Sequence, residues 1–109
     1  AEATLRGGNG TTTQALNYVN ALRQRANNNL TVGNIALSEL TLDFLIDERA
    51  RELHWEAHRR QDLIRFGKYE DAWTEKTNTN KNMRVFPIPQ TAIDGASNLT
   101  GYLKQNAGY

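Results

Sequence analysis

The sequence predicts a mainly α-helical chain, with an antiparallel pair of helices followed by a long irregular C-terminal segment. Apolar residues recur at three- and four-residue steps in two segments, about 12–27 and about 41–58, as on the buried face of a helix. No such period exists in residues 75–109. The 109 residues, 39% of them hydrophobic, supply one modest core, so we treat residues 1–109 as a single fragment.

The first helix is expected at about residues 12–27. Thr11 and Gln14 fit a capping box, in which the Thr11 hydroxyl accepts from the Gln14 backbone and the Gln14 amide reaches back. Three consecutive asparagines at positions 27–29 are expected to end the helix. Its apolar face consists of Ala15, Leu16, Val19, Leu22 and Ala26.

The second helix is expected at about residues 41–58, with a further turn at 60–66. Ser38 or Thr41 is positioned to cap it, and Gly67 suits a left-handed residue after the further turn. Its apolar stripe should face the first helix, which gives the antiparallel pair. The stripe comprises Leu42, Leu45, Ile46, Ala50, Leu53, Ala57 and Ile64.

The irregular segment at 75–109 begins with an exposed loop, Glu75 to Arg84, which lacks any apolar period. Two prolines make Val85 to Pro89 extended, because each proline fixes its own φ and disfavours helix at the residue before it. One helical turn is expected at Gln90 to Asp94. The tail is expected to be held by Leu99, Tyr102, Leu103 and Tyr109.

Charge and cysteine content exclude several functions. A formal charge of +1, from 13 basic and 12 acidic side chains, argues against an electrostatic binder of nucleic acid or anionic lipid. The absence of cysteine excludes disulfides, thiol catalysis and thiolate metal sites within this chain. No apolar run approaches the about 18 residues that a membrane-spanning helix needs. The start at Ala1-Glu-Ala looks internal to a longer protein.

His54 and His58, with Glu56 between them, have the four-residue spacing of some zinc sites. Zinc protease motifs place glutamate directly after the first histidine or directly before the second. Trp55 and Ala57 occupy those places, so both patterns fail. We therefore predict no metal site and no cofactor.

Glu48, Glu52 and Glu56 lie on one side of the second helix and could suggest acid–base catalysis. The alternative is structural, because arginines stand three or four residues away and such pairs stabilise an exposed helix by about 0.2–0.5 kcal/mol each. We favour the structural role and predict no catalytic residue. The arginines concerned are Arg49, Arg51, Arg59 and Arg60.

Aromatic side chains are the candidates for stacking on a sugar or another planar ligand. Trp55 lies within the expected second helix and should pack against an adjacent layer. Trp73 opens the Asn/Thr-rich loop and is the better candidate for an exposed platform, so it is our one candidate ligand-binding residue. The other aromatics weighed are Tyr69, Tyr102 and Tyr109.

Several segments together resemble the C-terminal part of the SusD/RagB family of outer-membrane nutrient-binding lipoproteins. Their order and spacing are similar to those of the family over nearly the whole chain. The segments are Ala15-Leu-Asn-Tyr-Val-Asn-Ala-Leu-Arg-Gln-Arg-Ala26, Glu48-Arg-Ala-Arg-Glu-Leu53, Arg59-Arg-Gln-Asp-Leu-Ile-Arg-Phe-Gly67, Phe86-Pro-Ile-Pro-Gln90 and Gln105-Asn-Ala-Gly-Tyr109. The family usually has Gly where Ala57 stands and Pro where Ala107 stands, and Gly101–Lys104 looks like a small insertion.

The resemblance implies helix pairs that form part of a larger tetratricopeptide-like α-helical superhelix. It also implies a lipid anchor at an N-terminal cysteine outside this fragment, and a place on the outward-facing surface of the bacterial outer membrane. There the protein would capture glycans or other nutrients and deliver them to a SusC-like TonB-dependent transporter, without catalysis. Ligand residues vary between family members and lie largely in loops and upstream regions, so none is transferred.

Three functions remain open at this stage. The first is a nutrient-binding lipoprotein, the second is a structural or interaction module without a ligand site of its own, and the third is a glycoside hydrolase. The second helix has an apolar face that the first cannot cover alone. Residues 1–109 by themselves should therefore expose apolar surface or need a partner, such as a second chain supplying the N-terminal part.

Overall fold

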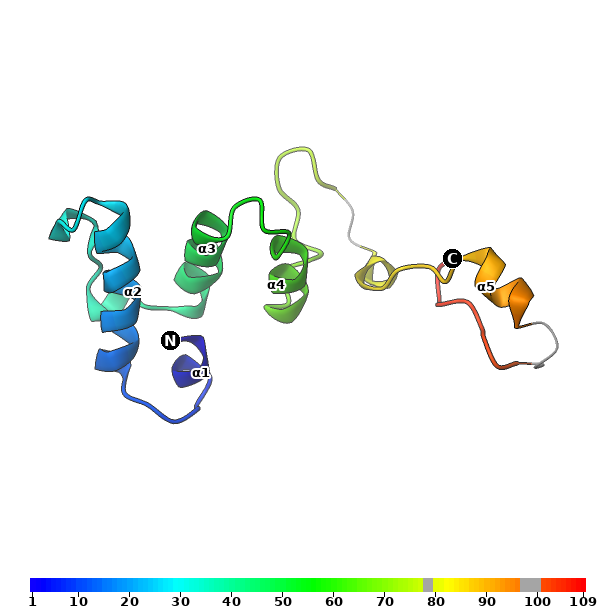
Figure 1. Ribbon diagram of the computed structural model, residues 1–109, viewed down its shortest axis with the longest axis horizontal. Coiled ribbons are helices and arrows are strands. Elements are labelled where there is room, and N and C mark those ends of the chain that lie inside the picture. The colour runs from blue at the N-terminus through cyan, green and yellow to red at the C-terminus, as the bar shows by residue number, and fades with distance from the viewer. Residues whose placement is uncertain (78–79, 97–100) are drawn as a thin grey trace. The chain divides into compact units, whose positions relative to one another are not determined.

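The computed structural model describes residues 1–77, 80–96 and 101–109. The chain forms two compact units, Ala1–Arg59 and Arg60–Tyr109. Within the described ranges there are five α-helices and three 3-10 helices and no extended strand, which confirms the mainly α fold class (Figure 1). In the same ranges, no helix is long and apolar enough to cross a membrane.

The first unit contains three α-helices and two 3-10 turns. The turns belong to the segment that connects the second and third of these helices. In order along the chain, the elements are α1 (Glu2–Leu5), α2 (Thr12–Ala26), η1 (Thr31–Gly33), η2 (Leu37–Glu39) and α3 (Leu42–Glu52).

Helix α2 agrees closely with its prediction. The Thr11 hydroxyl accepts from the Gln14 backbone N–H at 3.1 Å, as expected for the N-cap. The reciprocal half of the capping box is wrong, because the Gln14 amide donates instead to the Tyr18 hydroxyl at 3.0 Å. Asn28 and Asn29 end the helix with φ of 55° and 63°, a left-handed conformation that asparagine tolerates better than most residues.

Helix α3 begins as predicted but ends earlier. Thr41 is its cap, since the Thr41 hydroxyl accepts from the Phe44 N–H at 3.0 Å. The prediction extended the helix to residue 58, whereas it ends at Glu52. Residues 54–58 are all exposed, so no tertiary packing stabilises another turn there. Instead, Trp55 and Ala57 adopt left-handed conformations, with φ of 69° and 60°.

The predicted further turn is α4 (Arg59–Arg65), and its end follows the expectation for glycine. Gly67 has φ of 72°. Its N–H bonds the Ile64 carbonyl at 3.1 Å, while the Lys68 N–H bonds the Leu63 carbonyl at 2.8 Å. This pair of bonds is the Schellman motif, which satisfies the last carbonyls of a helix.

Helices α2 and α3 run parallel, so the predicted antiparallel pairing is wrong. Residue numbers rise together in the contacts between them: Leu45 joins Ala15 and Val19 in one core, and Glu48 pairs with Arg23 farther along. Figure 1 shows α2 and α3 beginning at the same end of the unit. The connection at 27–41 is long enough to return along α2, and this return makes the parallel arrangement possible.

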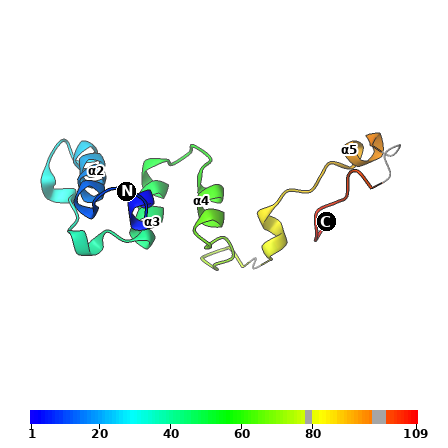
Figure 2. The ribbon, with the colours of Figure 1, turned by 90° about the horizontal axis from the view of Figure 1, so that it is seen from below.

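The core of the first unit is small. Helix α1 lies next to both α2 and α3 (Figure 2) and adds Ala1 and Leu5 to the packing. Large apolar side chains stay exposed, including Tyr18 at 58% and Val32 at 80%. This agrees with the expectation that residues 1–109 alone expose apolar surface. The buried residues that cluster together are Ala15, Val19, Ile35, Leu40 and Leu45, and Ile46 is also buried.

Among the described residues of the second unit, Asp62 and Leu63 are buried, and polar contacts hold the C-terminal tail. Gln105 makes two bonds to the Ile88 backbone, donating to its carbonyl at 2.9 Å and accepting from its N–H at 2.8 Å. Asn106 donates to the Phe86 carbonyl at 2.7 Å, and the Tyr109 hydroxyl donates to the Val85 carbonyl at 3.0 Å. These bonds hold the C-terminal tail against the extended segment at 85–89.

The predicted elements of this unit are largely present. Val85 and Pro89 have extended backbone, as two prolines require, and α5 (Gln90–Gly95) forms the expected helical turn. The predicted loop at 75–84 includes a short 3-10 helix, η3 (Lys81–Arg84). Among the expected tail anchors, Leu103 is half-buried and Tyr102 is 72% exposed, so Tyr102 is not an anchor. Leu99 lies outside the described residues.

Candidate functional site

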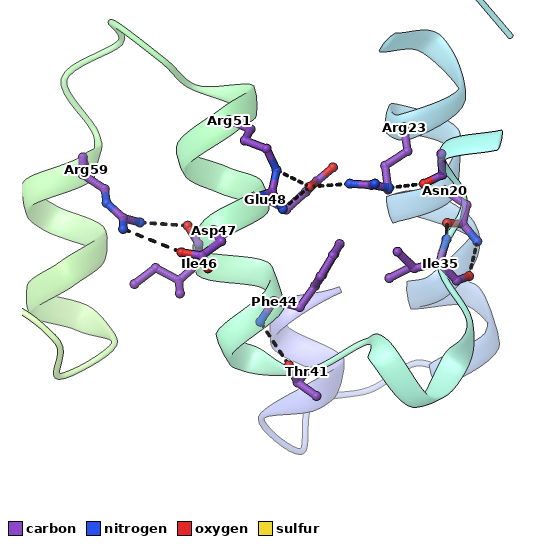
Figure 3. A network of polar contacts seen from close by, with 11 residues as sticks. Asn20, Arg23, Ile35, Thr41, Phe44, Ile46, Asp47, Glu48, Arg51 and Arg59 are labelled. Atoms are coloured by element: carbon purple, nitrogen blue, oxygen red, sulfur yellow. Dashed lines mark hydrogen bonds and ion pairs between the residues drawn. The ribbon is translucent and has the colours of Figure 1, made fainter. Parts of the chain in front are cut away.

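Two glutamates of α3, Glu48 and Glu52, form ion pairs with arginines. Glu48, whose side chain is 13% exposed, accepts from Arg23 at 2.8 Å and from Arg51 at 2.7 Å. Figure 3 shows the two guanidinium groups approaching the Glu48 carboxylate from different sides. Glu52 is paired in the same way with Arg25 of α2. The Glu48–Arg51 pair is of the predicted kind, within one helix, whereas the pairs with Arg23 and Arg25 join α3 to α2 and were not predicted.

The same face of α2 holds the connecting segment in place. The Asn20 amide donates to the Ile35 carbonyl at 3.1 Å and accepts from the Ile35 N–H at 2.9 Å, replacing a strand-like pair of backbone bonds (Figure 3). Arg23 also donates to the Gly33 carbonyl. Asn20 and Arg23 thus satisfy the backbone of a segment that has few backbone partners of its own.

The C-terminal part of the first unit has a similar arginine contact. Arg59 donates to the Ile46 carbonyl at 2.9 Å and lies 3.7 Å from the Asp47 carboxylate (Figure 3). The loop between α3 and Arg59 is therefore tied back to the first turns of α3.

The histidine pair is not brought into a metal site. His54 contacts the neighbouring Trp55 ring edge-to-face, with ring centroids 6.0 Å apart. Among the described residues, no group of three or more His, Cys, Asp or Glu side chains is arranged to hold a metal ion. The expectation that no metal or cofactor binds remains a prediction.

Trp55 is not packed against another layer, so that expectation is wrong. Its side chain is 92% exposed. The physical reason is the early end of α3: Trp55 lies beyond the last helical turn, and its left-handed φ turns the backbone away from the helical path.

Trp73, the candidate platform, lies at a tight turn and is 48% exposed. Trp73 and Lys76 exchange two backbone hydrogen bonds, of 3.2 and 2.9 Å, and Glu75 between them has φ of 67°. The turn places the Lys76 ammonium 4.0 Å from the centre of the Trp73 ring. This cation–π contact fixes the indole while nearly half of its surface stays open.

Lys76 and Arg60 form contacts that sequence reasoning missed. Arg60 lies over Phe86 at 4.2 Å and over Tyr69 at 5.4 Å, and it donates to the Met83 and Arg84 carbonyls at 2.7 and 3.0 Å. Lys76 lies over the same Tyr69 ring at 5.2 Å. Cations and rings therefore alternate across the second unit. Met83, Arg84 and Phe86 lie more than 20 residues from Arg60, and no local pattern signals such contacts.

One carboxyl group of the second unit has a perturbed pKa. Arg84 donates to both oxygens of Glu70 at 2.6 Å. This hydrogen bonding lowers the pKa of Glu70 below its ordinary value of 4.5 and raises the pKa of Arg84. A glutamate with a lowered pKa is a poor general acid, so we assign the Glu70–Arg84 pair a structural role.

A groove of about 470 Å³ lies among the three helices of the first unit. Val19 and Leu45, both nearly fully buried, belong to its lining. Tyr18 and Leu22 also line it, and they are 58% and 38% exposed. The complete lining is Ala1, Glu2, Ala3, Tyr18, Val19, Leu22, Leu45, Glu48, Arg49, Glu52 and Leu53.

Comparison with known proteins now identifies the class to which this helical chain belongs. The SusD family profile matches residues 1–109, and the chain is a member of the SusD family. The resemblance noted in the sequence is thereby confirmed.

A particular relative is the starch-binding protein SusD of Bacteroides thetaiotaomicron. It is 35% identical to this chain over 118 residues, an alignment that covers 100% of the chain and 19% of the relative. The chain thus spans about a fifth of the length of that relative.

Proposed function

We propose that the protein containing this chain binds a glycan or a similar nutrient, without altering it chemically, at the outward-facing surface of the bacterial outer membrane. The observation that carries the proposal is the match of the whole chain to the SusD family, together with 35% identity to a starch-binding protein. The bound nutrient would pass to a SusC-like TonB-dependent transporter, and an N-terminal lipid would anchor the binding protein.

The arrangement of carboxylates supports a role without catalysis. A glycoside hydrolase needs two carboxyl groups that flank the scissile bond and have separated pKa values. Glu48, Glu52 and Glu70 are instead each paired with arginine. Hydrolysis of a bound glycan that disappears in Glu52→Gln or Glu56→Gln variants would contradict this part of the proposal.

Within this chain, we propose Trp73 as the residue that contacts the glycan. An indole face suits the C–H groups of a pyranose ring, since aromatic side chains combine a large apolar surface with a polar edge. Lys76 holds the ring in one orientation, so little side-chain entropy would be lost on binding. Because Lys76 covers one face of the indole, the other face would remain available to the sugar.

Calorimetry of the intact protein against soluble starch, a β-glucan, a mannan and a xylan tests the binding itself. Measurable binding to at least one polysaccharide is expected. Consistent absence of binding across the panel would count against glycan recognition and favour the role of an interaction scaffold.

The contribution of Trp73 is tested by Trp73→Ala, with Trp55→Ala as the matched control. Loss of an aromatic contact of roughly 0.5–1.5 kcal/mol would raise the dissociation constant about 2- to 13-fold. Trp55 is exposed but lacks the Lys76 contact, and its replacement should leave affinity unchanged. Equal affinities for the two variants and the wild-type protein would remove Trp73 from the site and leave glycan binding intact.

A further inference from the structure

The turn between α1 and α2 contains Asn9-Gly10, the one Asn-Gly sequence of this chain. Residues 6–10 are all exposed. Among the described residues, the Asn9 side-chain amide has no hydrogen-bond partner, and the Gly10 N–H donates to none. The Asn9 carbonyl does accept from the Thr4 hydroxyl, at 3.5 Å. The Asn9 side chain is therefore followed by a backbone nitrogen that no hydrogen bond holds in place.

The geometry of this turn requires glycine after Asn9. Gly10 has φ of 128°, a conformation that residues with a side chain rarely adopt. A Cβ at this position would also lie 2.7 Å from Thr4 Oγ1, which is closer than atoms in contact approach. The missing side chain that lets the turn form also leaves the Gly10 nitrogen open to approach by the Asn9 side chain. The turn thus keeps a chemically reactive pair in the sequence.

The remaining asparagines lack this combination. Of the twelve asparagines in the chain, eleven are followed by a residue that has a side chain. Asn20 also lies inside α2, with its amide bonded to Ile35. The one Asp-Gly sequence, Asp94-Gly95, lies within α5, and Asp94 accepts from Gln90 at 2.8 Å. A helical backbone keeps the following nitrogen away from the side-chain carbonyl carbon, so Asp94 is protected where Asn9 is not.

We propose that Asn9 is a site of spontaneous deamidation and isoaspartate formation. The Gly10 nitrogen attacks Asn9 Cγ, a new C–N bond closes a succinimide ring, and the Cγ–Nδ2 bond breaks, so that ammonia leaves with the proton of the Gly10 N–H. Solvent water then opens the ring at one of its two carbonyl carbons. Opening at Cγ gives aspartate, whereas opening at the main-chain carbonyl gives isoaspartate, in which the main chain runs through the former side-chain carbon. The reaction does not depend on glycan binding.

The two products should affect the turn differently. The aspartate form keeps the main chain unchanged and adds a negative charge near the N-terminus of α2, whose first turn has no acidic residue. The isoaspartate form lengthens the main chain beside the bond from the Gly8 N–H to the Ala3 carbonyl, which measures 2.8 Å. This bond fixes the end of α1, and Leu5 of α1 packs against the core. Isoaspartate should therefore loosen α1, whereas aspartate should not.

Peptide mapping by mass spectrometry after incubation of the intact protein tests the reaction. A mass increase of about 1 Da should appear in the peptide that contains Asn9 several-fold faster than in any other asparagine peptide. Protein isoaspartyl methyltransferase should label the same peptide. The rate should rise in mildly alkaline buffer, because the attacking nitrogen must give up its proton. Asn9→Gln should abolish the change, and Asn17→Gln, which alters an exposed asparagine of α2, should leave it as in the wild-type protein.

The same incubation in urea separates the chemistry of the sequence from the protection given by the fold. Asn9 should react at nearly the same rate in the folded and the unfolded protein, whereas isomerisation of Asp94 should speed up several-fold on unfolding. Reaction at Asn9 that is no faster than at the other asparagines, or that is much slower in the folded protein than in urea, would overturn the proposal.

Hydrogen–deuterium exchange tests the consequence for α1. In the isoaspartate form, separated from the aspartate form by chromatography, the Gly8 amide should exchange several-fold faster than in the unmodified protein. Freshly purified Asn9→Asp has the charge without the longer main chain, and its Gly8 amide should exchange at the wild-type rate. Wild-type exchange in the isoaspartate form, or equally fast exchange in Asn9→Asp, would overturn the predicted effect on the turn.

Discussion

Replacing Asn20 with alanine should detach the connecting segment from α2. The Asn20 amide makes both of its bonds to the backbone of one residue, Ile35, at 3.1 and 2.9 Å. Ile35 is itself buried, so its N–H and carbonyl cannot easily find water after the substitution. The segment contains two 3-10 turns and no longer helix of its own. Asn20 is therefore a main fixed point between η1 and η2.

The magnitude follows from these two bonds. Each contributes about 1 kcal/mol net, and a partly buried backbone group left unpaired costs about 1–3 kcal/mol. The substitution also stabilises α2 by about 0.5 kcal/mol, because alanine has a higher helix propensity than asparagine. The expected loss is about 2 kcal/mol. Asn17→Ala is the matched control, since Asn17 is an exposed asparagine in the interior of the same helix and gains the same helix propensity.

Two measurements on the intact protein check this value. Urea denaturation should show a loss of stability in Asn20→Ala relative to Asn17→Ala. Hydrogen–deuterium exchange should show the Ile35 amide exchanging about 30-fold faster in Asn20→Ala, which corresponds to about 2 kcal/mol. If both variants have the same stability and the Ile35 amide keeps its protection, the Asn20 bonds do not hold this segment and the reasoning is refuted.

Two further predictions concern a titration and a strained turn. The pKa of Glu70 is lowered by Arg84, so this pair stabilises the fold above about pH 4.5 and is lost as pH falls through the lowered pKa. NMR should place the Glu70 midpoint below 4.5, and Glu70→Gln should reduce the loss of stability on acidification; an unshifted midpoint would contradict the pairing. Ala57→Gly should raise stability by about 0.5–1 kcal/mol, because Ala57 has φ of 60° and glycine adopts this conformation without strain. Ala50→Gly, in the interior of α3, should lower stability by about 1 kcal/mol in the same denaturation assay, and a loss at both positions would show that the turn is not strained.

Local signals in the sequence were reliable because their causes are local. Thr11 and Thr41 bond a backbone N–H three residues away, so both helix starts could be predicted from short stretches. Gly67 takes the left-handed conformation that ends α4, and the two prolines keep the segment at 85–89 extended. The family, too, was recognisable from the order of its motifs.

The candidate site was predicted less completely. The structural role of Glu48 and Glu52 follows from nearby arginines, although Glu52 pairs with Arg25 of another helix and not with a neighbour in sequence. Trp55 was predicted to pack against another layer but is exposed. The prediction placed it inside the helix, whereas α3 ends at Glu52. The cation–π contacts of Arg60 and Lys76 in the second unit could not be predicted from the sequence.

Sequence by itself determined where α2 and α3 begin and the family to which the chain belongs, and it placed Ala15, Val19, Leu45 and Ile46 correctly on buried helix faces. Ala57 of the predicted stripe lies beyond α3 and is exposed. Tertiary structure decided the direction of α3 relative to α2, the end of α3 at Glu52, and the open groove that the three helices leave. The physical reason is that a periodic pattern fixes which face of a helix is buried but carries no information about the direction of its partner. That direction is decided by the connecting segment, whose backbone is held by Asn20 and Arg23 on α2.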